Sequence, residues 1–111
     1  VMIDTTEEVP AMNKKYGNLY FPSLITKQTY SGMAKDNNVA AVANLLVVNA
    51  SMSDAEAYKI VKAVFDNQLE LVRSHAEYRN VKLETQKANA TPVPYHPGAL
   101  KYFKEKGVKV N

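Results

Sequence analysis

A helix-start signal in the middle of the chain sets the strongest limit on the fold. Ser53-Asp54-Ala55-Glu56 has the spacing of a capping box, in which the serine hydroxyl and the glutamate carboxylate each bond the other residue's backbone N–H. Beyond it, apolar residues recur at helical spacing. We therefore expect one long amphipathic helix over Asp54–Glu77. Its apolar stripe would consist of Ala57, Ile60, Val61, Val64, Phe65, Leu69, Leu71 and Val72.

An apolar run before this helix predicts a buried strand. Val39–Val48 consists of Val, Ala and Leu apart from Asn44, without polar alternation, a pattern typical of strands covered on both faces. Inside such a strand the Asn44 amide needs hydrogen-bond partners, which either the fold or a ligand could supply. The apolar residues 19–25 predict a second strand with an irregularity at Pro22. The polar residues 27–38 predict a loop.

Shorter signals mark both ends of the chain. Val1–Ile3 is apolar and predicts the end of a further buried strand. A short helix is expected over residues 7–16, with Gly17 as its stop. At the other end, Pro97 suits the first turn and Gly107 the stop of a final helix. The apolar face of this final helix would consist of Ala99, Leu100 and Phe103, with Tyr102 at its border.

The expected elements alternate between strands and helices, which indicates an α/β layer structure. Residues 79–92 are polar and are expected to be irregular, with a turn or two of helix near Leu83–Ala88. Two or three strands make a thin sheet, and a strand buried on both faces needs neighbours on both sides. We therefore expect the rest of the sheet to be encoded upstream of Val1.

Composition excludes several functional classes. With no cysteine among its 111 residues, the chain has no disulfide, thiolate zinc site, cysteine nucleophile or Fe–S cluster. No apolar run reaches the roughly 18 residues that a membrane-spanning helix needs. The net charge of +3 comes from scattered basic residues rather than from a basic stripe, which argues against nucleic-acid binding.

The sequence contains no motif of a catalytic or metal site. His75 and His96 are its two histidines, and neither has another ligand at metal-binding spacing. The four glycines stand alone, which excludes a phosphate-binding P-loop, a dinucleotide-binding turn and a nucleophile elbow. We therefore expect no enzyme, no metal and no cofactor.

Tyr30 is a candidate binding residue because it lies in the polar loop expected over residues 27–38. A tyrosine there either covers the edge of the core or offers its ring and hydroxyl to a ligand, since loops between strands often carry binding groups. The residues alone leave both interpretations open.

The C-terminal residues resemble the signature of a known family. Pro92-Val93-Pro94-Tyr95-His96-Pro97-Gly98-Ala99 is similar to the P-[IV]-P-x-H-P-G-A pattern of the TAXI family, the solute-binding subunits of a class of TRAP transporters. Three further segments agree with this family in order and spacing: Thr29-Tyr30-Ser31-Gly32 with its T-Y-x-G, Asn44–Val48 with its buried strand, and Ser53–Phe65 with its capped helix.

This resemblance implies the C-terminal portion of a two-lobed type II periplasmic-binding-protein fold, with few strands, a long helix and a terminal helix. Residues 1–111 would be a single partial domain, the C-terminal third of the receptor, and a strand at about residues 39–49 would cross the hinge. The protein would be periplasmic or extracytoplasmic, with a signal peptide upstream. It would capture a small organic anion, a dicarboxylate or a glutamate-like acid, and deliver it to a membrane permease. The resemblance implies no covalent chemistry and no membrane insertion of this segment.

The resemblance also suggests roles for individual residues. Thr29 and Tyr30 would line the ligand cleft, and Asn44 would be a polar contact near the hinge. His96, Pro97 and Gly98 would be structural and would fix the turn into the last helix. Lys27-Gln28 stand where the family usually has small residues, so the loop backbone and the ligand could differ here. Two other classes remain open: an effector-binding or stand-alone α/β interaction domain, and an enzyme.

Overall fold

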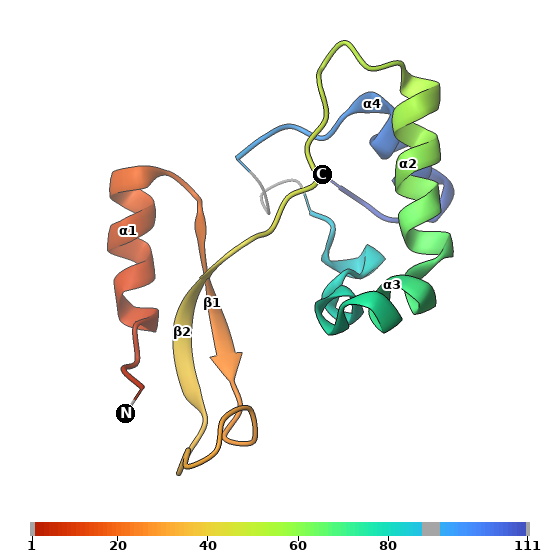
Figure 1. The fold of residues 1–111 in the computed structure, drawn as a ribbon. Coiled ribbons are helices and arrows are strands. Elements are labelled where there is room, and N and C mark those ends of the chain that lie inside the picture. Colours follow the sequence, from red (N-terminus) through yellow and green to blue (C-terminus); the bar gives the residue numbers. More distant parts are fainter. Residues whose placement is uncertain (1, 88–91, 111) are drawn as a thin grey trace. The chain divides into compact units, whose positions relative to one another are not determined.

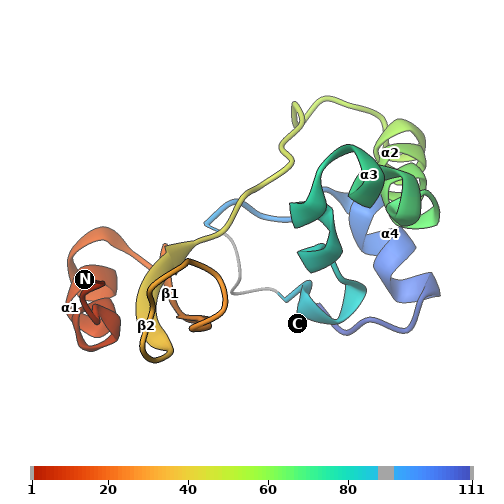
Figure 2. The same cartoon turned by 60° about the horizontal axis from the view of Figure 1, so that its bottom comes forward.

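The elements of the chain fall into two groups, one on each side of the Leu45–Leu46 bond, and each group folds around its own contacts. The computed structural model describes residues 2–87 and 92–110. The first unit, residues 1–45, contains a helix and a β-hairpin, and the second, residues 46–111, is helical (Figures 1 and 2). The α/β class expected from the sequence is confirmed. No helix in the described ranges is long and apolar enough to cross a membrane.

The first unit consists of one helix beside two antiparallel strands (Figure 1). Its elements are the 3₁₀ helix Thr6–Glu8, α1 (Val9–Tyr16), β1 (Tyr20–Ile25) and β2 (Asn37–Val42). Gly17 ends α1 with a φ of +87°, which glycine adopts without steric cost. The strand register runs from Tyr20 opposite Val42 to Ile25 opposite Asn37. The helix expected over residues 7–16 and the strand expected over 19–25 are therefore confirmed.

Two asparagines hold this unit together. The Asn13 side chain accepts hydrogen bonds from the backbone N–H groups of Leu19 and Tyr20, at 3.2 and 3.0 Å, and donates to the Tyr20 carbonyl at 2.9 Å. It thereby ties α1 to the start of β1. Asn37, only 6% exposed, donates to the carbonyls of Ile3 and Asn38, both at 3.1 Å. These bonds satisfy amides that would be costly to bury unpaired.

The strand expected over Val39–Val48 is wrong in its bounds, because β2 ends at Val42 and no strand covers the remainder of residues 39–49. Its one neighbour among the described residues, β1, starts opposite Val42, so residues 43–48 have no strand to pair with there. The side chains of Leu46 and Val47 are 72% and 64% exposed. The strand end expected at Val1–Ile3 is also wrong for the residues described, since Ile3 lies in no strand and is 77% exposed; Val1 lies outside the described residues.

The second unit is a set of short helices in which α2 packs against α4 (Figure 2). Its elements are α2 (Asp54–Asp66), α3 (Gln68–Ser74), the 3₁₀ helices Ala76–Asn80 and Leu83–Thr85, and α4 (Pro97–Glu105). Pro97 is the first residue of α4, and the N–H groups of Gly107 and Val108 close its end by bonding to the carbonyls of Lys104 and Phe103. The final helix and both of its end signals are therefore as predicted. The helical turn near 83–88 is confined to Leu83–Thr85, and Ala88 lies outside the described residues.

The single helix expected over Asp54–Glu77 is wrong, because Asn67 divides it. Asn67 has φ −110° and ψ 24°, and its side-chain amide donates to the Ala63 carbonyl at 2.8 Å. Asparagine side chains compete for backbone groups in this way and favour helix ends over helix interiors. Leu69, expected in the apolar stripe, is 81% exposed on α3.

The core of the second unit is built around Tyr102. This side chain is 1% exposed, and its ring stacks on Phe65 with centroids 5.8 Å apart and meets Tyr58 edge-on at 5.7 Å. Leu100, expected in the apolar face of the final helix, is 41% exposed. The prediction for these two residues is therefore wrong: Tyr102 lies in the core, and Leu100 is exposed. The other buried members of this cluster are Ala99, Phe103 and Val110.

Candidate functional site

The loop between β1 and β2, residues 26–36, holds two of the three predicted ligand-binding residues. It consists of two tight turns. In the first, the Thr29 N–H donates to the Thr26 carbonyl at 2.9 Å, and the two threonine hydroxyls are 3.2 Å apart. In the second, the Met33 N–H lies 3.4 Å from the Tyr30 carbonyl, and Gly32 has a φ of +85°. A positive φ at the third residue of a turn favours glycine, which accounts for the glycine of the Thr29–Gly32 motif.

Lys27 and Gln28 are the central residues of the first turn. Among the described residues, no residue other than glycine has a positive φ. The first turn therefore needs no glycine, and lysine and glutamine fit it without strain. Both side chains are exposed. The departure from small residues at these two positions does not disturb the backbone that presents Thr29 and Tyr30.

A carboxylate closes the base of this loop. The Asp36 Oδ1 atom accepts a hydrogen bond from the Lys27 N–H at 2.8 Å. The last backbone pair of the hairpin is Ile25 opposite Asn37, so this bond adds a further link just beyond the ladder. Sequence reasoning assigned Asp36 only to a polar loop. Its role depends on strand register, which the sequence does not show.

Tyr30 is 58% exposed, so its ring does not serve to cover the core of the first unit. Thr29 next to it is also exposed. These two predicted residues, which are adjacent in the sequence, thus stand exposed on one loop whose backbone is fixed by hydrogen bonds. A phenol and a hydroxyl can each donate a hydrogen bond to a carboxylate.

Asn44 lies at the other end of the hairpin from this loop. β2 begins directly after the loop and spans six residues, about 20 Å, before Asn44 is reached. Asn44 is exposed and outside any strand, so the buried-strand environment expected for its amide is wrong. The structure of the first unit does not bring Asn44 together with Thr29 and Tyr30.

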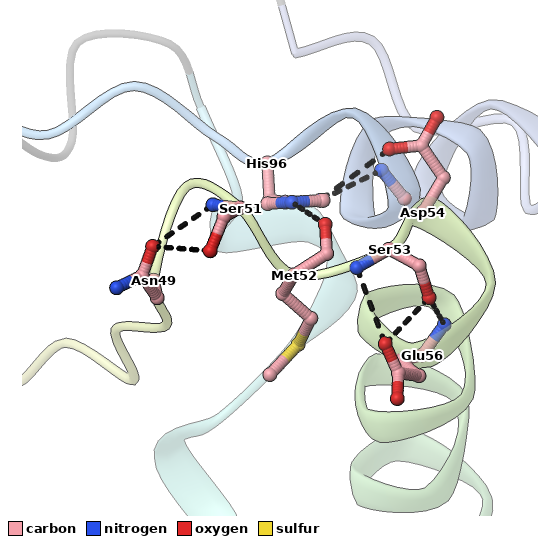
Figure 3. A network of polar contacts seen from close by, with 8 residues as sticks. Asn49, Ser51, Met52, Ser53, Asp54, Glu56 and His96 are labelled. Atoms are coloured by element: carbon pink, nitrogen blue, oxygen red, sulfur yellow. Dashed lines mark hydrogen bonds and ion pairs between the residues drawn. The ribbon is translucent and has the colours of Figure 1, made fainter.

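The predicted structural residues join the starts of α4 and α2 (Figure 3). The His96 Nδ1 atom accepts from the Gly98 N–H at 3.2 Å and so caps α4, while Nε2 lies 3.1 Å from the Met52 carbonyl. Because a carbonyl can only accept, Nε2 carries the proton in the neutral ring. One imidazole therefore bonds both helix starts.

Gly98 is buried where the two helices touch. A Cβ atom on Gly98 would lie 2.9 Å from both the Ala57 Cβ and the Tyr58 backbone N, and closer still to the Asp54 carbonyl oxygen. Glycine thus lets α4 approach the backbone of α2. The proline before it has no N–H to satisfy at this first helical position.

The capping box on α2 belongs to the same network (Figure 3). The Ser53 hydroxyl oxygen accepts from the Glu56 N–H at 3.3 Å, and Glu56 Oε2 accepts from the Ser53 N–H at 3.2 Å and from its hydroxyl at 2.6 Å. The hydrogen bond from the Ser53 hydroxyl, and to a smaller extent the one from the Ser53 backbone N–H, holds the pKa of the Glu56 carboxyl below its ordinary value. The capping box predicted from the sequence is confirmed.

The second unit also carries an open hollow of about 430 Å³ between the Leu83 turn and the C-terminal residues. Its lining residues are Leu83, Glu84, Lys87, Lys106, Gly107, Val108 and Lys109. None of the residues expected to bind ligand belongs to this lining, and neither do His96, Pro97 and Gly98. The hollow therefore does not coincide with the predicted site.

A comparison with protein families gives a match over almost the whole of these 111 residues. A model described as the NMT1-like family, which is tied to periplasmic binding proteins, matches residues 1–107. The match includes both the loop at residues 26–36 and the His96–Gly98 junction. A search of curated proteins finds none that matches the chain.

Proposed function

Because the chain belongs to the NMT1-like family, a family tied to periplasmic binding proteins, we propose that it captures a small organic anion outside the cytoplasm and delivers it to a membrane permease. The family match supports a solute-binding domain. The finer assignment, to the TAXI type of TRAP transporter subunit, rests on the resemblance of Pro92–Ala99 and Thr29–Gly32 to the patterns of that type.

The observation that carries this proposal is the loop at residues 26–36, where an exposed phenol and an exposed hydroxyl stand on a hydrogen-bonded backbone. Groups fixed in advance bind a ligand with less loss of conformational entropy than groups that must be ordered on binding. The loop also carries Lys27 and Lys35 against one acid, Asp36. This positive balance favours an anion over a cation.

In the proposed mechanism the ligand is bound and released without covalent change, and the protein is not an enzyme. The hydroxyls of Thr29 and Tyr30 donate to the ligand carboxylate. Asn44, about 20 Å away along β2, takes no part in this contact. Closure of the two lobes would be stabilised by contacts that the ligand makes only in the closed state. Release to the permease then requires that the permease favour the open state.

The test is a pair of tyrosine substitutions in the natural protein that carries these residues, titrated calorimetrically with L-glutamate and with succinate. Tyr30→Ala should weaken binding more than tenfold, the equivalent of about 1.4 kcal/mol. Tyr16→Ala is the matched control, because Tyr16 is similarly exposed, at 55%, and lies on α1 in the same unit. The control should bind like the wild type.

A third variant separates the ring from the hydroxyl. Tyr30→Phe keeps the ring and removes the donor, so we expect it to lose most of the affinity that Tyr30→Ala loses. An unchanged dissociation constant in Tyr30→Ala would remove Tyr30 from the site. If the wild-type protein binds neither acid, the proposed ligand class is wrong.

A further inference from the structure

We infer that Asp36 is a positioning residue for ligand binding, because its carboxylate closes the loop that presents Thr29 and Tyr30. The inference rests on the proposed function and extends it to a residue that the family patterns quoted above do not include. The contact that carries it is the hydrogen bond from the Lys27 N–H to Asp36 Oδ1, at 2.8 Å.

This bond lies where it can fix the orientation of the loop relative to the two strands. Backbone pairing ends at Ile25 opposite Asn37, and the bond from the Lys27 N–H to Asp36 Oδ1 joins the two sides of the chain just beyond that pair. The two turns inside the loop are local, because each is closed by a hydrogen bond between residues three positions apart. Local turns fix the shape of each half of the loop but do not fix either half relative to the strands. The Lys27–Asp36 bond supplies that connection.

Without the bond the two local turns would remain, but the loop would be joined to the strands only at its two ends. Such a loop samples many conformations, and the apparent affinity falls by the fraction of molecules in which the binding groups are correctly placed. A hydrogen bond to a charged acceptor stabilises more than one between neutral groups. We therefore expect its loss to weaken ligand binding by about five- to tenfold.

The experiment compares Asp36→Ala with Asp36→Asn in the natural protein, using L-glutamate and succinate as probes. Alanine removes the acceptor, whereas asparagine keeps an Oδ1 acceptor and removes only the charge. We expect Asp36→Ala to raise the dissociation constant and Asp36→Asn, which keeps a neutral acceptor, to restore part of the affinity. A general effect of charge would instead raise the affinity of both variants for these anions, because both remove a negative charge.

Asp4→Ala is the matched control. Asp4 Oδ1 accepts from the Thr6 N–H at 3.0 Å, a bond of the same type outside the loop, and Asp4 Oδ2 accepts from the Asn38 side-chain amide at 3.2 Å. This variant should leave the affinity unchanged. Amide hydrogen exchange gives a readout without ligand: the Lys27 N–H should exchange several-fold faster in Asp36→Ala, but not in Asp36→Asn or Asp4→Ala.

The outcomes separate this inference from the proposed function. If Tyr30→Ala weakens binding but Asp36→Ala does not, the loop binds ligand and the positioning role of Asp36 is wrong. Equal losses in Asp36→Ala and Asp36→Asn would show that a hydrogen-bond acceptor at residue 36 is not what ligand binding needs, and would also overturn the inference. If the wild-type protein binds neither probe, the proposed function and this inference both fail.

Discussion

Substituting Gly98 by alanine tests the packing of α4 on α2 directly. A Cβ atom at this position would lie 2.9 Å from the Ala57 Cβ and from the Tyr58 backbone N, and closer to the Asp54 carbonyl oxygen. Two of these three atoms belong to the backbone of α2 and have no rotamer to change. To accept the methyl group, the start of α4 must move away from α2.

The expected magnitude follows from two opposing effects. Alanine is favoured over glycine within a helix by about 1 kcal/mol, so the same change at an exposed helical position would stabilise the protein. Forcing an extra carbon into a packed interface costs about 1–3 kcal/mol and sometimes more. Because the obstruction is backbone, we expect the upper end of this range and a net loss of about 2 kcal/mol. For a unit of this size that corresponds to a fall in Tm of roughly 10 °C.

Thermal and urea unfolding followed by far-UV circular dichroism would measure this loss in the full chain. Lys104→Ala, at an exposed position on the same helix, should change the stability by less than about 0.5 kcal/mol. Combining Gly98→Ala with Ala57→Gly removes the side-chain contact but leaves both backbone contacts, so the double variant should not recover. A Tm for Gly98→Ala at or above that of the wild type would refute the reasoning, and full recovery in the double variant would show that a side chain, not the backbone, was the obstacle.

Two further predictions concern the same junction. His96→Ala should destabilise the chain by about 1–3 kcal/mol in urea unfolding, because it removes the cap of α4 and leaves the Met52 carbonyl without its donor. His96→Asn should recover part of this loss, since asparagine can cap a helix. If His96→Asn recovers nothing, the whole effect belongs to the Met52 bond. Glu56→Gln should be less stable than the wild type at pH 7, and the difference should shrink as the pH falls below 4.5, the ordinary pKa of the carboxyl. The pKa of Glu56 is lowered from its ordinary value of 4.5 in the folded chain, so its contribution is complete above that value and is lost as the pH falls through the folded pKa; a difference in Tm that does not change with pH would contradict this.

Local signals in the sequence were sufficient to predict the features that depend on bonds between residues close together in the chain. Ser53 and Glu56 are three residues apart, and the ends of α4 at Pro97 and Gly107 depend on the chain next to them. The break at Asn67 is also local, but helical spacing of apolar residues on both sides concealed it. Asparagine within an otherwise continuous helical pattern was the signal that could have shown it.

The remaining features depend on contacts that sequence periodicity does not contain. Whether Leu46 and Val47 are buried depends on which strands lie beside them, and composition alone predicted that they would be. Which of the two residues is buried, Tyr102 or the predicted Leu100, depends on where α2 approaches α4. At the candidate site, the motif predicted Thr29 and Tyr30 as ligand groups, but the bond of Asp36 to the Lys27 N–H could be seen only once the hairpin had brought the two ends of the loop together.

The His96–Met52 bond has a consequence for the order in which the chain folds. It joins residues 44 positions apart, and Tyr102, the most buried side chain, comes from the same late segment. During synthesis the N-terminal part of a chain emerges first, so α2 leaves the ribosome well before the residues that cover its apolar side. The second unit can therefore complete its fold only after residues 96–103 have been synthesised, and a nascent chain stopped before residue 96 would keep α2 without its anchor.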